Sequence, residues 1–173
     1  MSSDFRSKIL RAGSVALLVA LSAVITGCQV RPLYSEAGGM QQKLGAIAFS
    51  EAKDRIGQVV RNRLIFLTGG GAGEAVNPQY EVELTVTSSL AQVLLIDTSD
   101  RARAGHVFVK AGYILRRSSD GEVIKAGERR AMAMVDFPIQ EFAKVRAIRD
   151  AESRAANEAA ELVRADLAAA LGR

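Results

Sequence analysis

The sequence is poor in the residues that build disulfides, histidine metal sites and aromatic clusters. Its 173 residues include one cysteine, one histidine and no tryptophan, and only 5% of them are aromatic. A single cysteine excludes an intramolecular disulfide, so in an oxidising compartment the chain must be stable through packing alone. A single histidine, His106, excludes a zinc site built from several histidines. We therefore expect a core of small aliphatic side chains, with no metal and no cofactor.

Charge of one sign and long apolar runs are scarce as well. The formal net charge is +4, and three basic residues and one acidic residue within the first 27 account for half of it. The remaining 146 residues therefore carry only about +2, which argues against nucleic-acid binding. The apolar run from Ala12 to Ile25 is shorter than the roughly 20 residues of a membrane-spanning helix. We expect no bilayer-spanning segment in the mature chain.

This apolar run has the flanks of a secretory signal. Basic residues precede it and the small residues Thr26 and Gly27 follow it. The tetrapeptide Ile25-Thr26-Gly27-Cys28 resembles the lipobox of bacterial lipoproteins. The resemblance implies that residues 1–27 are removed, that Cys28 is acylated, and that Gln29 directs the protein to the outer membrane. Several acyl chains together give firm anchoring, whereas one is marginal. The alternative is a soluble periplasmic protein cut at another small residue.

Periodicity then divides the mature chain into a tether and one domain. Residues 28–43 show no period and predict a tether, and residues 44–173 are long enough for a single core. Apolar residues at spacing two predict strands, and apolar residues at spacing three to four predict helices. The predicted strands cover 44–49, 80–96, 107–115 and 123–135, and the predicted helices begin at Ala52, with Ser50 as N-cap, and at Ile139.

This order predicts an α+β fold: a two-layer sandwich with a mainly antiparallel four-stranded sheet and two helices on one face, in the order βαβββα. Tight turns join the last three strands, so we expect them to form an antiparallel meander. The predicted core face of the last helix changes along its length from large to small side chains. That face contains Phe142, Val145, Ile148, Ala151, Ala155, Ala159, Leu162 and Val163.

No catalytic constellation stands out. The glycines at 69–73 follow a helix and lack the Gly-Lys-Ser/Thr ending of a phosphate loop, so they predict a connector. His106 could join a Ser-His-Asp triad, but a surface strand residue is the simpler interpretation. Glu81 and Glu83 lie on one face of a predicted strand, as in any polar strand face. We expect a protein that is not an enzyme.

The third predicted hairpin carries a cluster of basic residues. These residues are Lys110, Arg116, Arg117, Lys125, Arg129 and Arg130. Cationic side chains at a hairpin rim can bind phosphate or carboxylate groups of an anionic lipid. Odd and even members point to opposite faces of a strand, so they do not all join one patch. The alternative is a solvated sheet face whose charges serve solubility.

The assembled pattern resembles a known family. The lipobox, Arg31-Pro32-Leu33-Tyr34, the segment 55–62, the strands through Tyr113 and the segment 142–152 are similar to the alphaproteobacterial form of LptE, a lipopolysaccharide-assembly lipoprotein. This resemblance implies a plug inside the LptD β-barrel, anchored on the periplasmic side of the outer membrane, that helps deliver lipopolysaccharide. The candidate lipopolysaccharide contacts Arg116, Arg117, Lys125, Arg129 and Arg130 come from the charge cluster alone. Two rivals stay open: an outer-membrane lipoprotein with a structural or scaffold role and no barrel partner, and a lipid-anchored hydrolase.

Overall fold

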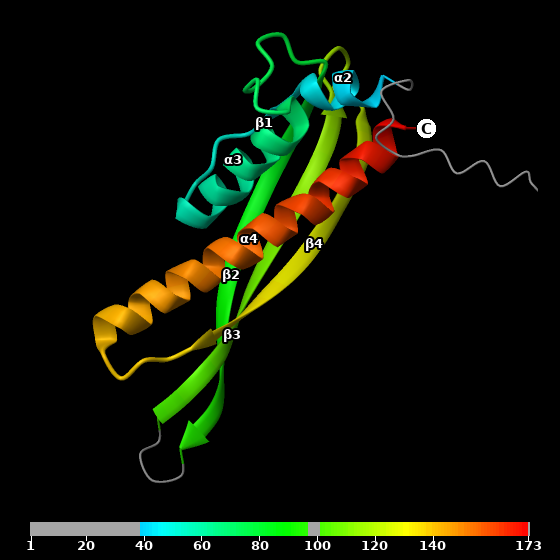
Figure 1. Ribbon diagram of the computed structural model, residues 1–173. Helices are drawn as coiled ribbons and strands as arrows, with labels where there is room; N and C mark the ends of the chain where they lie inside the picture. Colours follow the sequence, from blue (N-terminus) through cyan, green and yellow to red (C-terminus); the bar gives the residue numbers. More distant parts are fainter. Residues whose placement is uncertain (1–38, 97–100, 173) are drawn as a thin grey trace, which may run out of the picture. The chain divides into compact units, whose positions relative to one another are not determined.

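The computed structural model describes residues 39–96 and 101–172, without the side chains of 93–96 and 101–102. The predicted signal, Cys28 and the first part of the tether lie outside these residues, as does the predicted turn at 97–100. Figure 1 shows a sheet with helices on one side. The elements in chain order are α2 (Met40–Gly45), β1 (Ile47–Phe49), α3 (Arg55–Gly69), β2 (Tyr80–Ile96), β3 (Arg101–Arg117), β4 (Val123–Asp136) and α4 (Glu141–Leu171).

The four strands form one mixed sheet in the order β1-β2-β3-β4. β1 runs parallel to β2, and the β2–β3 and β3–β4 pairs are antiparallel. The parallel pair follows from the connection, because α3 carries the chain back before β2 begins. The hairpin between β3 and β4 turns at Asp120-Gly121, where Gly121 has φ 73°. The α+β class and the order βαβββα are confirmed, and the antiparallel meander is β2-β3-β4.

Two local predictions near the start of the domain are wrong. Met40–Gly45 form a short helix where tether and strand were expected, and the strand begins only at Ile47. The apolar Leu44 belongs to this helix and is fully buried there. α3 begins at Arg55, and its N-cap is Asp54, whose carboxylate accepts a hydrogen bond from the Gly57 N–H at 2.6 Å. Ser50 instead accepts a hydrogen bond at Oγ from the Leu84 N–H at 2.9 Å.

The core lies between the sheet and the two long helices. Alternate residues of β2 and β3 point into it as the period of two predicts, among them Val82, Val109 and Leu115. α4 contributes an alanine stripe that is fully buried, consisting of Ala151, Ala155, Ala156, Ala159 and Ala160. Because alanine has a single side-chain carbon, the helix backbone can lie close to the elements that it contacts.

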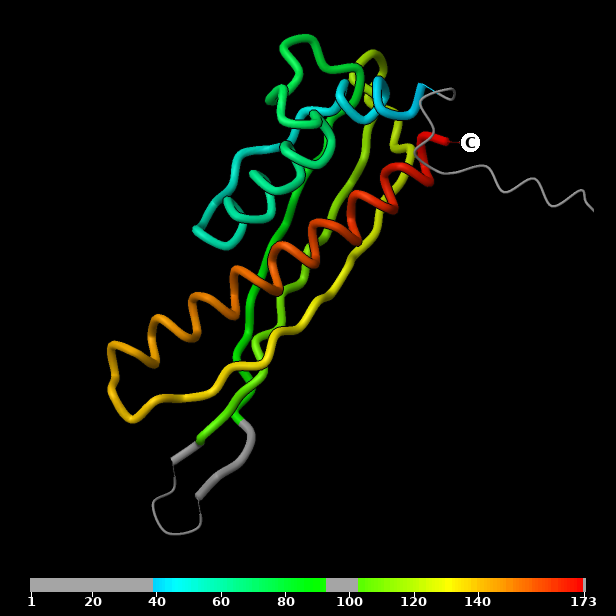
Figure 2. Tube along the Cα trace, in the orientation of Figure 1, coloured from blue at the N-terminus to red at the C-terminus, as the bar shows by residue number. Residues whose placement is uncertain are grey.

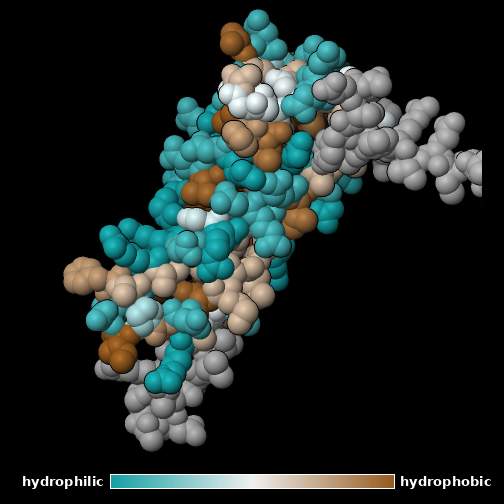
Figure 3. Space-filling model, in the orientation of Figure 1, coloured by the Kyte–Doolittle hydropathy of each residue, from teal (hydrophilic) through white to brown (hydrophobic). Residues whose placement is uncertain are grey.

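The start of α4 departs from the predicted core face. Phe142 is 90% exposed and Val145 is 47% exposed, although both keep the helical spacing. α3 and α4 run side by side in the same direction, since Arg55 pairs with Glu152 and Arg63 pairs with Glu161. The first ten residues of α4 therefore extend beyond the start of α3. Figure 2 shows α4 running obliquely across the strands, and in Figure 3 apolar side chains protrude where α4 begins.

Candidate functional site

The candidate site is the sheet face opposite the helices. α3 and α4 lie together on one side of the sheet (Figure 1). No element of residues 39–96 or 101–172 covers the other side, which we call the open face. The strand registers place three rows of side chains there. From β2 come Glu81, Glu83, Thr85, Thr87 and Ser89, from β3 His106, Phe108, Lys110, Ile114 and Arg116, and from β4 Ala126, Glu128, Arg130, Met132 and Met134.

Two cations face each other in the middle of the open face. Lys110 on β3 is directly opposite Arg130 on β4, a position that puts two Cβ atoms about 4.5–5.5 Å apart. Like charges directly opposite each other destabilise a sheet. Glu128 offsets part of this repulsion, with its carboxylate 3.8 Å from the Lys110 ammonium. Arg130 forms no ion pair with any residue that the structure describes.

Apolar side chains adjoin this cationic pair on the same face. Phe108 is opposite Met132, one step along the strands from Lys110 and Arg130, and His106 is opposite Met134. Met132 is 42% exposed and Met134 is 64% exposed. The rings of His106 and Phe108 meet edge to face with centroids 6.2 Å apart. The open face therefore combines paired cations with an apolar strip, an arrangement suited to an anionic amphiphile.

The structure divides the predicted basic cluster between two faces and a turn. Arg116 and Arg130 lie on the open face, with Arg116 opposite Glu81. Lys125 and Arg129 are opposite Leu115 and Ala111 and so lie on the side of the helices. The strand registers therefore separate the basic residues as the alternation of a strand predicts, and they leave Arg116 and Arg130, with Lys110, on the open face.

Arg129 is engaged inside the domain. Its guanidinium donates two hydrogen bonds to the Asp166 carboxylate on α4, at 2.5 and 2.6 Å, and the Tyr113 hydroxyl donates a third at 2.8 Å. The Arg129 hydrogen bonds hold the pKa of Asp166 below its usual value. Burial, followed by the hydrogen bond to Asp166, raises the pKa of Tyr113. Gly127 makes room for Tyr113, because a Cβ there would lie 2.7 Å from the hydroxyl. Arg129 therefore joins β4 to α4.

Arg117 closes the hairpin between β3 and β4. Its guanidinium donates to Asp120 at 2.9 Å and to Glu122 at 2.6 Å. These hydrogen bonds raise the pKa of Arg117. The hydrogen bond from the Glu122 backbone N–H, followed by the one from Arg117, lowers the pKa of Asp120. Two carboxylates therefore already pair with Nη1 of Arg117 and offset the charge with which it would bind a phosphate.

The other residues considered from the sequence show no catalytic arrangement. His106 has Ala91 and Met134 as its cross-strand neighbours, and neither supplies an acid or a nucleophile. Gly70, Gly71 and Gly73 adopt positive φ angles just after α3. Within the described ranges no cluster of three or more potential metal ligands exists. No helix in these ranges is both long and apolar enough to cross a bilayer.

Sequence reasoning missed the apolar strip beside the cations. Phe108, Met132 and Met134 sit at the polar positions of their strands, out of phase with the buried residues. Their positions could have been recognised in the sequence, because large apolar residues on the solvent side of a half-buried strand break the expected alternation of apolar and polar residues.

Comparison with known proteins identifies relatives of the fold. The sequence matches no family model and no curated protein. A candidate lipoprotein from Caulobacter crescentus CB15 has a similar structure, with a TM-score of 0.63 and 21% identity, over 78% of this chain and 98% of that one. Rare lipoprotein B from Shewanella oneidensis follows with a TM-score of 0.54 and 13% identity, over 71% of this chain and 92% of that one. At these identities the likeness shows a shared fold.

Proposed function

We propose that this protein is an outer-membrane lipoprotein that occupies the lumen of an LptD-like β-barrel and assists lipopolysaccharide assembly. Two independent observations support the proposal that the protein is a lipoprotein. The sequence has a lipobox at Cys28, and the fold is shared with a candidate lipoprotein of Caulobacter and with rare lipoprotein B of Shewanella. The proposals of a barrel partner and of lipopolysaccharide as the ligand rest on the resemblance of the sequence motifs to the LptE family.

The Lys110–Arg130 pair on the open face is the observation that carries the ligand proposal. A pair of like charges that one carboxylate offsets only in part costs stability, and natural proteins retain such local conflicts mainly at functional sites. A bound phosphate removes the conflict because it accepts charge-assisted hydrogen bonds from both cations. Phe108 and Met132 lie next to the pair. Lipopolysaccharide carries phosphates beside acyl chains, so one molecule can contact the cations and the apolar strip together.

A binding role also agrees with the chemistry of the described residues. We propose a role other than catalysis, because His106, the one histidine of the sequence, has Ala91 and Met134 as its cross-strand neighbours. The β2 side of the open face is polar, with Glu81, Thr85, Thr87 and Ser89. A polar surface suits the polar interior of an outer-membrane barrel. The helix-covered face supplies the rigid backing for that surface.

Detergent extraction and pull-down through a C-terminal tag test the barrel proposal. We expect a large outer-membrane β-barrel protein to be recovered with the full-length chain. A Cys28→Ser variant, which cannot be acylated at that position, controls for dependence on the anchor. Recovery of the lipoprotein without any barrel protein would contradict the plug role and favour the scaffold role.

Binding of purified lipopolysaccharide tests the cationic pair. Replacing Lys110 and Arg130 by serine removes both cations, and we expect affinity to fall about tenfold or more, since each charge-assisted hydrogen bond contributes about 1.5–3 kcal/mol. Arg117→Ser is the matched control, because Arg117 is equally basic but already pairs with Asp120 and Glu122. Unchanged binding by the double variant would mean that the open face is a solvated sheet face whose charges serve solubility.

A further inference from the structure

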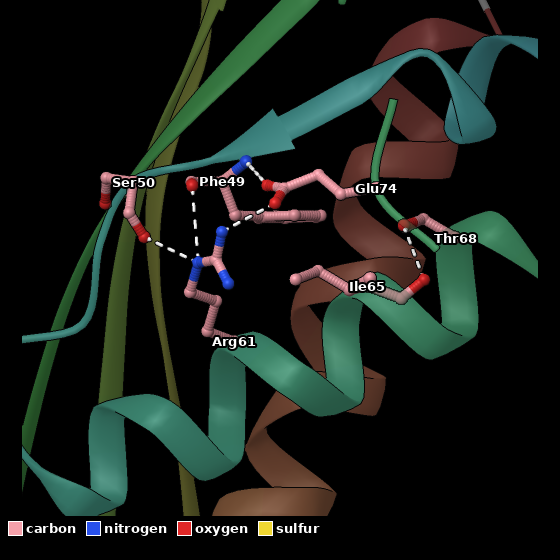
Figure 4. A network of polar contacts seen from close by, with 6 residues as sticks. All are labelled: Phe49, Ser50, Arg61, Ile65, Thr68 and Glu74. Carbon is pink, nitrogen blue, oxygen red and sulfur yellow. Dashed lines mark hydrogen bonds and ion pairs between the residues drawn. The ribbon is translucent and has the colours of Figure 1, made fainter. Parts of the chain in front are cut away.

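The outer edge of β1 is closed by the protein's own side chains. Glu74 accepts a hydrogen bond from the Phe49 N–H at 2.8 Å, and Arg61 donates to the Ser50 carbonyl at 3.1 Å (Figure 4). Arg61 and Glu74 also pair with each other at 2.6 Å. An incoming strand would therefore have to displace an ion pair and its hydrogen bonds in order to reach this edge.

The outer edge of β4 is protected in a different way. Phe137, just beyond β4, donates its N–H to the Arg103 carbonyl on β3 at 2.7 Å. By alternation, odd-numbered backbone groups of β4 face β3 and even-numbered groups face outward. Arg154 on α4 occupies one outward group, donating to the Met134 carbonyl at 2.9 Å. The strand also contains five charged residues: Lys125, Glu128, Arg129, Arg130 and Asp136. Charges of this kind discourage pairing between sheet edges.

Beyond its first half, the outer edge of β2 has neither the side-chain hydrogen bonds that close β1 nor the charged residues that protect β4. The Leu84 N–H points outward to Ser50, so even-numbered backbone groups of β2 face away from β3. From Ser88 onward, these outward groups bond to no residue that the structure describes. The stretch 85–96 contains no charged residue, no proline and no glycine. A long, uncharged, unpaired edge strand is an aggregation hazard that natural proteins normally avoid.

We infer that the free edge of β2, residues 88–96, is a strand-addition site for an extended segment of the barrel partner. The inference rests on the proposed function for the identity of the partner. Strand addition satisfies the outward N–H and C=O groups by main-chain hydrogen bonds, and alternate side chains give specificity. Leu90 is 39% exposed on the side of the helices, and Ser89 lies on the open face. The segment that fits is uncharged and alternates apolar with small polar residues.

A second copy of this chain fits the same edge less well. Residues 88–96 offer nine residues on each side of a two-fold pair, whereas a standard interface uses about 20–30 residues a side. Before Ser88, an added strand could not pair with β2 along its whole length, because β1 and the hydrogen bond from the Leu84 N–H to Ser50 already lie along that edge. A larger partner can add a strand here and obtain the remaining contacts from the adjoining open face.

Proline substitution tests the free edge of β2. Ser88→Pro removes an outward N–H on that edge, and Val76→Pro is the control in the loop before β2, where Val76 is 93% exposed. Edge strands and exposed loops tolerate proline at such positions, so both variants should keep their thermal midpoints. In the pull-down, we expect Ser88→Pro to recover about tenfold less barrel protein than the parent chain, as loss of a ladder hydrogen bond predicts. Val76→Pro should recover the parental amount.

A photo-cross-linking residue at position 88 or 76 gives a second measurement that does not depend on proline. We expect cross-links to the barrel protein from position 88 and few from position 76. Equal recovery by the parent and Ser88→Pro, with equal cross-linking from both positions, would overturn the edge inference and leave the barrel role standing. Absence of any barrel protein from the parent pull-down would overturn both. A dimer of the parent chain that Ser88→Pro dissociates, measured by light scattering, would replace the barrel segment with a second copy.

Discussion

The two parts of α4 have the same apolar spacing and opposite environments. From Ala151 to Leu171 the helix buries one face of alanine, valine and leucine against α3 and the sheet, although Leu162 of the predicted core face is 39% exposed. Before Ala151, Phe142 and Val145 follow the same period, yet Phe142 is 90% exposed. The exposed part has the larger apolar side chains, so hydrophobicity alone does not decide burial. The deciding factor is the length of the neighbouring helix.

Helix lengths make this explanation quantitative. α4 has 31 residues and α3 has 15, which correspond to about 46 Å and 22 Å at 1.5 Å per residue. The ion pairs Arg55–Glu152 and Arg63–Glu161 fix how the two helices align. About ten residues of α4 therefore extend past the start of α3 and have no helical neighbour. Periodicity reports which side of a helix is apolar; it does not report how far the opposing layer reaches.

The largest expected effect is at the buried end of α4. Leu167 is fully buried in the core, so Leu167→Ala removes apolar contacts and leaves a cavity. We expect the free energy of unfolding to fall by about 2–5 kcal/mol. Urea unfolding of the detergent-solubilised protein measures this loss. A loss below about 1 kcal/mol would mean that this end of the helix is packed no better than its start, and the contrast would be wrong.

A smaller effect is expected at the carboxylate that joins α4 to the sheet. Asp166→Asn removes the charge that Arg129 and Tyr113 contact. Because the hydrogen bonds from Arg129 lower the pKa of Asp166 in the folded state, its contribution is present above about pH 4, the unfolded value, and is lost as pH falls through the lowered folded pKa. The stability difference between parent and variant should therefore shrink below pH 4, as measured by urea unfolding at several pH values.

Asp150→Asn is the matched control in the exposed part of α4. Asp150 pairs with Arg154 one turn along the helix, and its side chain is 69% exposed. Exposed pairs of this kind contribute about 0.3–0.5 kcal/mol. If Asp150→Asn were to lower stability as much as Asp166→Asn, burial against the sheet would not distinguish the two carboxylates.

Much of the fold follows from local pattern. The alternation in 80–87 and 107–115 predicts both the strands and their buried sides, and Asp120-Gly121 predicts the hairpin. The start of the domain is harder, because Met40–Gly45 is a six-residue helix whose stability comes from packing. The cap is harder for a similar reason. Ser50 and Asp54 are both good N-caps, and the contact of Ser50 with Leu84 excludes it from that role.

The candidate site was predictable only in part. Basic residues in one hairpin and their alternation between faces are visible in the sequence, but which residues come opposite each other depends on strand register and on the bulge near Arg116. The engagement of Arg129 by Asp166 joins residues 37 positions apart and needs the docking angle of α4. The free edge of β2 depends on how short β1 is. None of these features has a local signal, because each arises from elements that meet only after folding.

The smallest expected effect concerns the exposed start of α4. Phe142→Ser removes a large apolar side chain that is 90% exposed, so little buried surface is lost. Serine and phenylalanine have similar helix propensities, and the helix itself should be unaffected. We expect a change within about 0.5 kcal/mol in the free energy of unfolding, as for other exposed positions. Leu167→Ser is the matched control and should be strongly destabilising. A loss above about 1 kcal/mol for Phe142→Ser would show that Phe142 packs on the domain in solution, and the distinction between the two parts of α4 would fail.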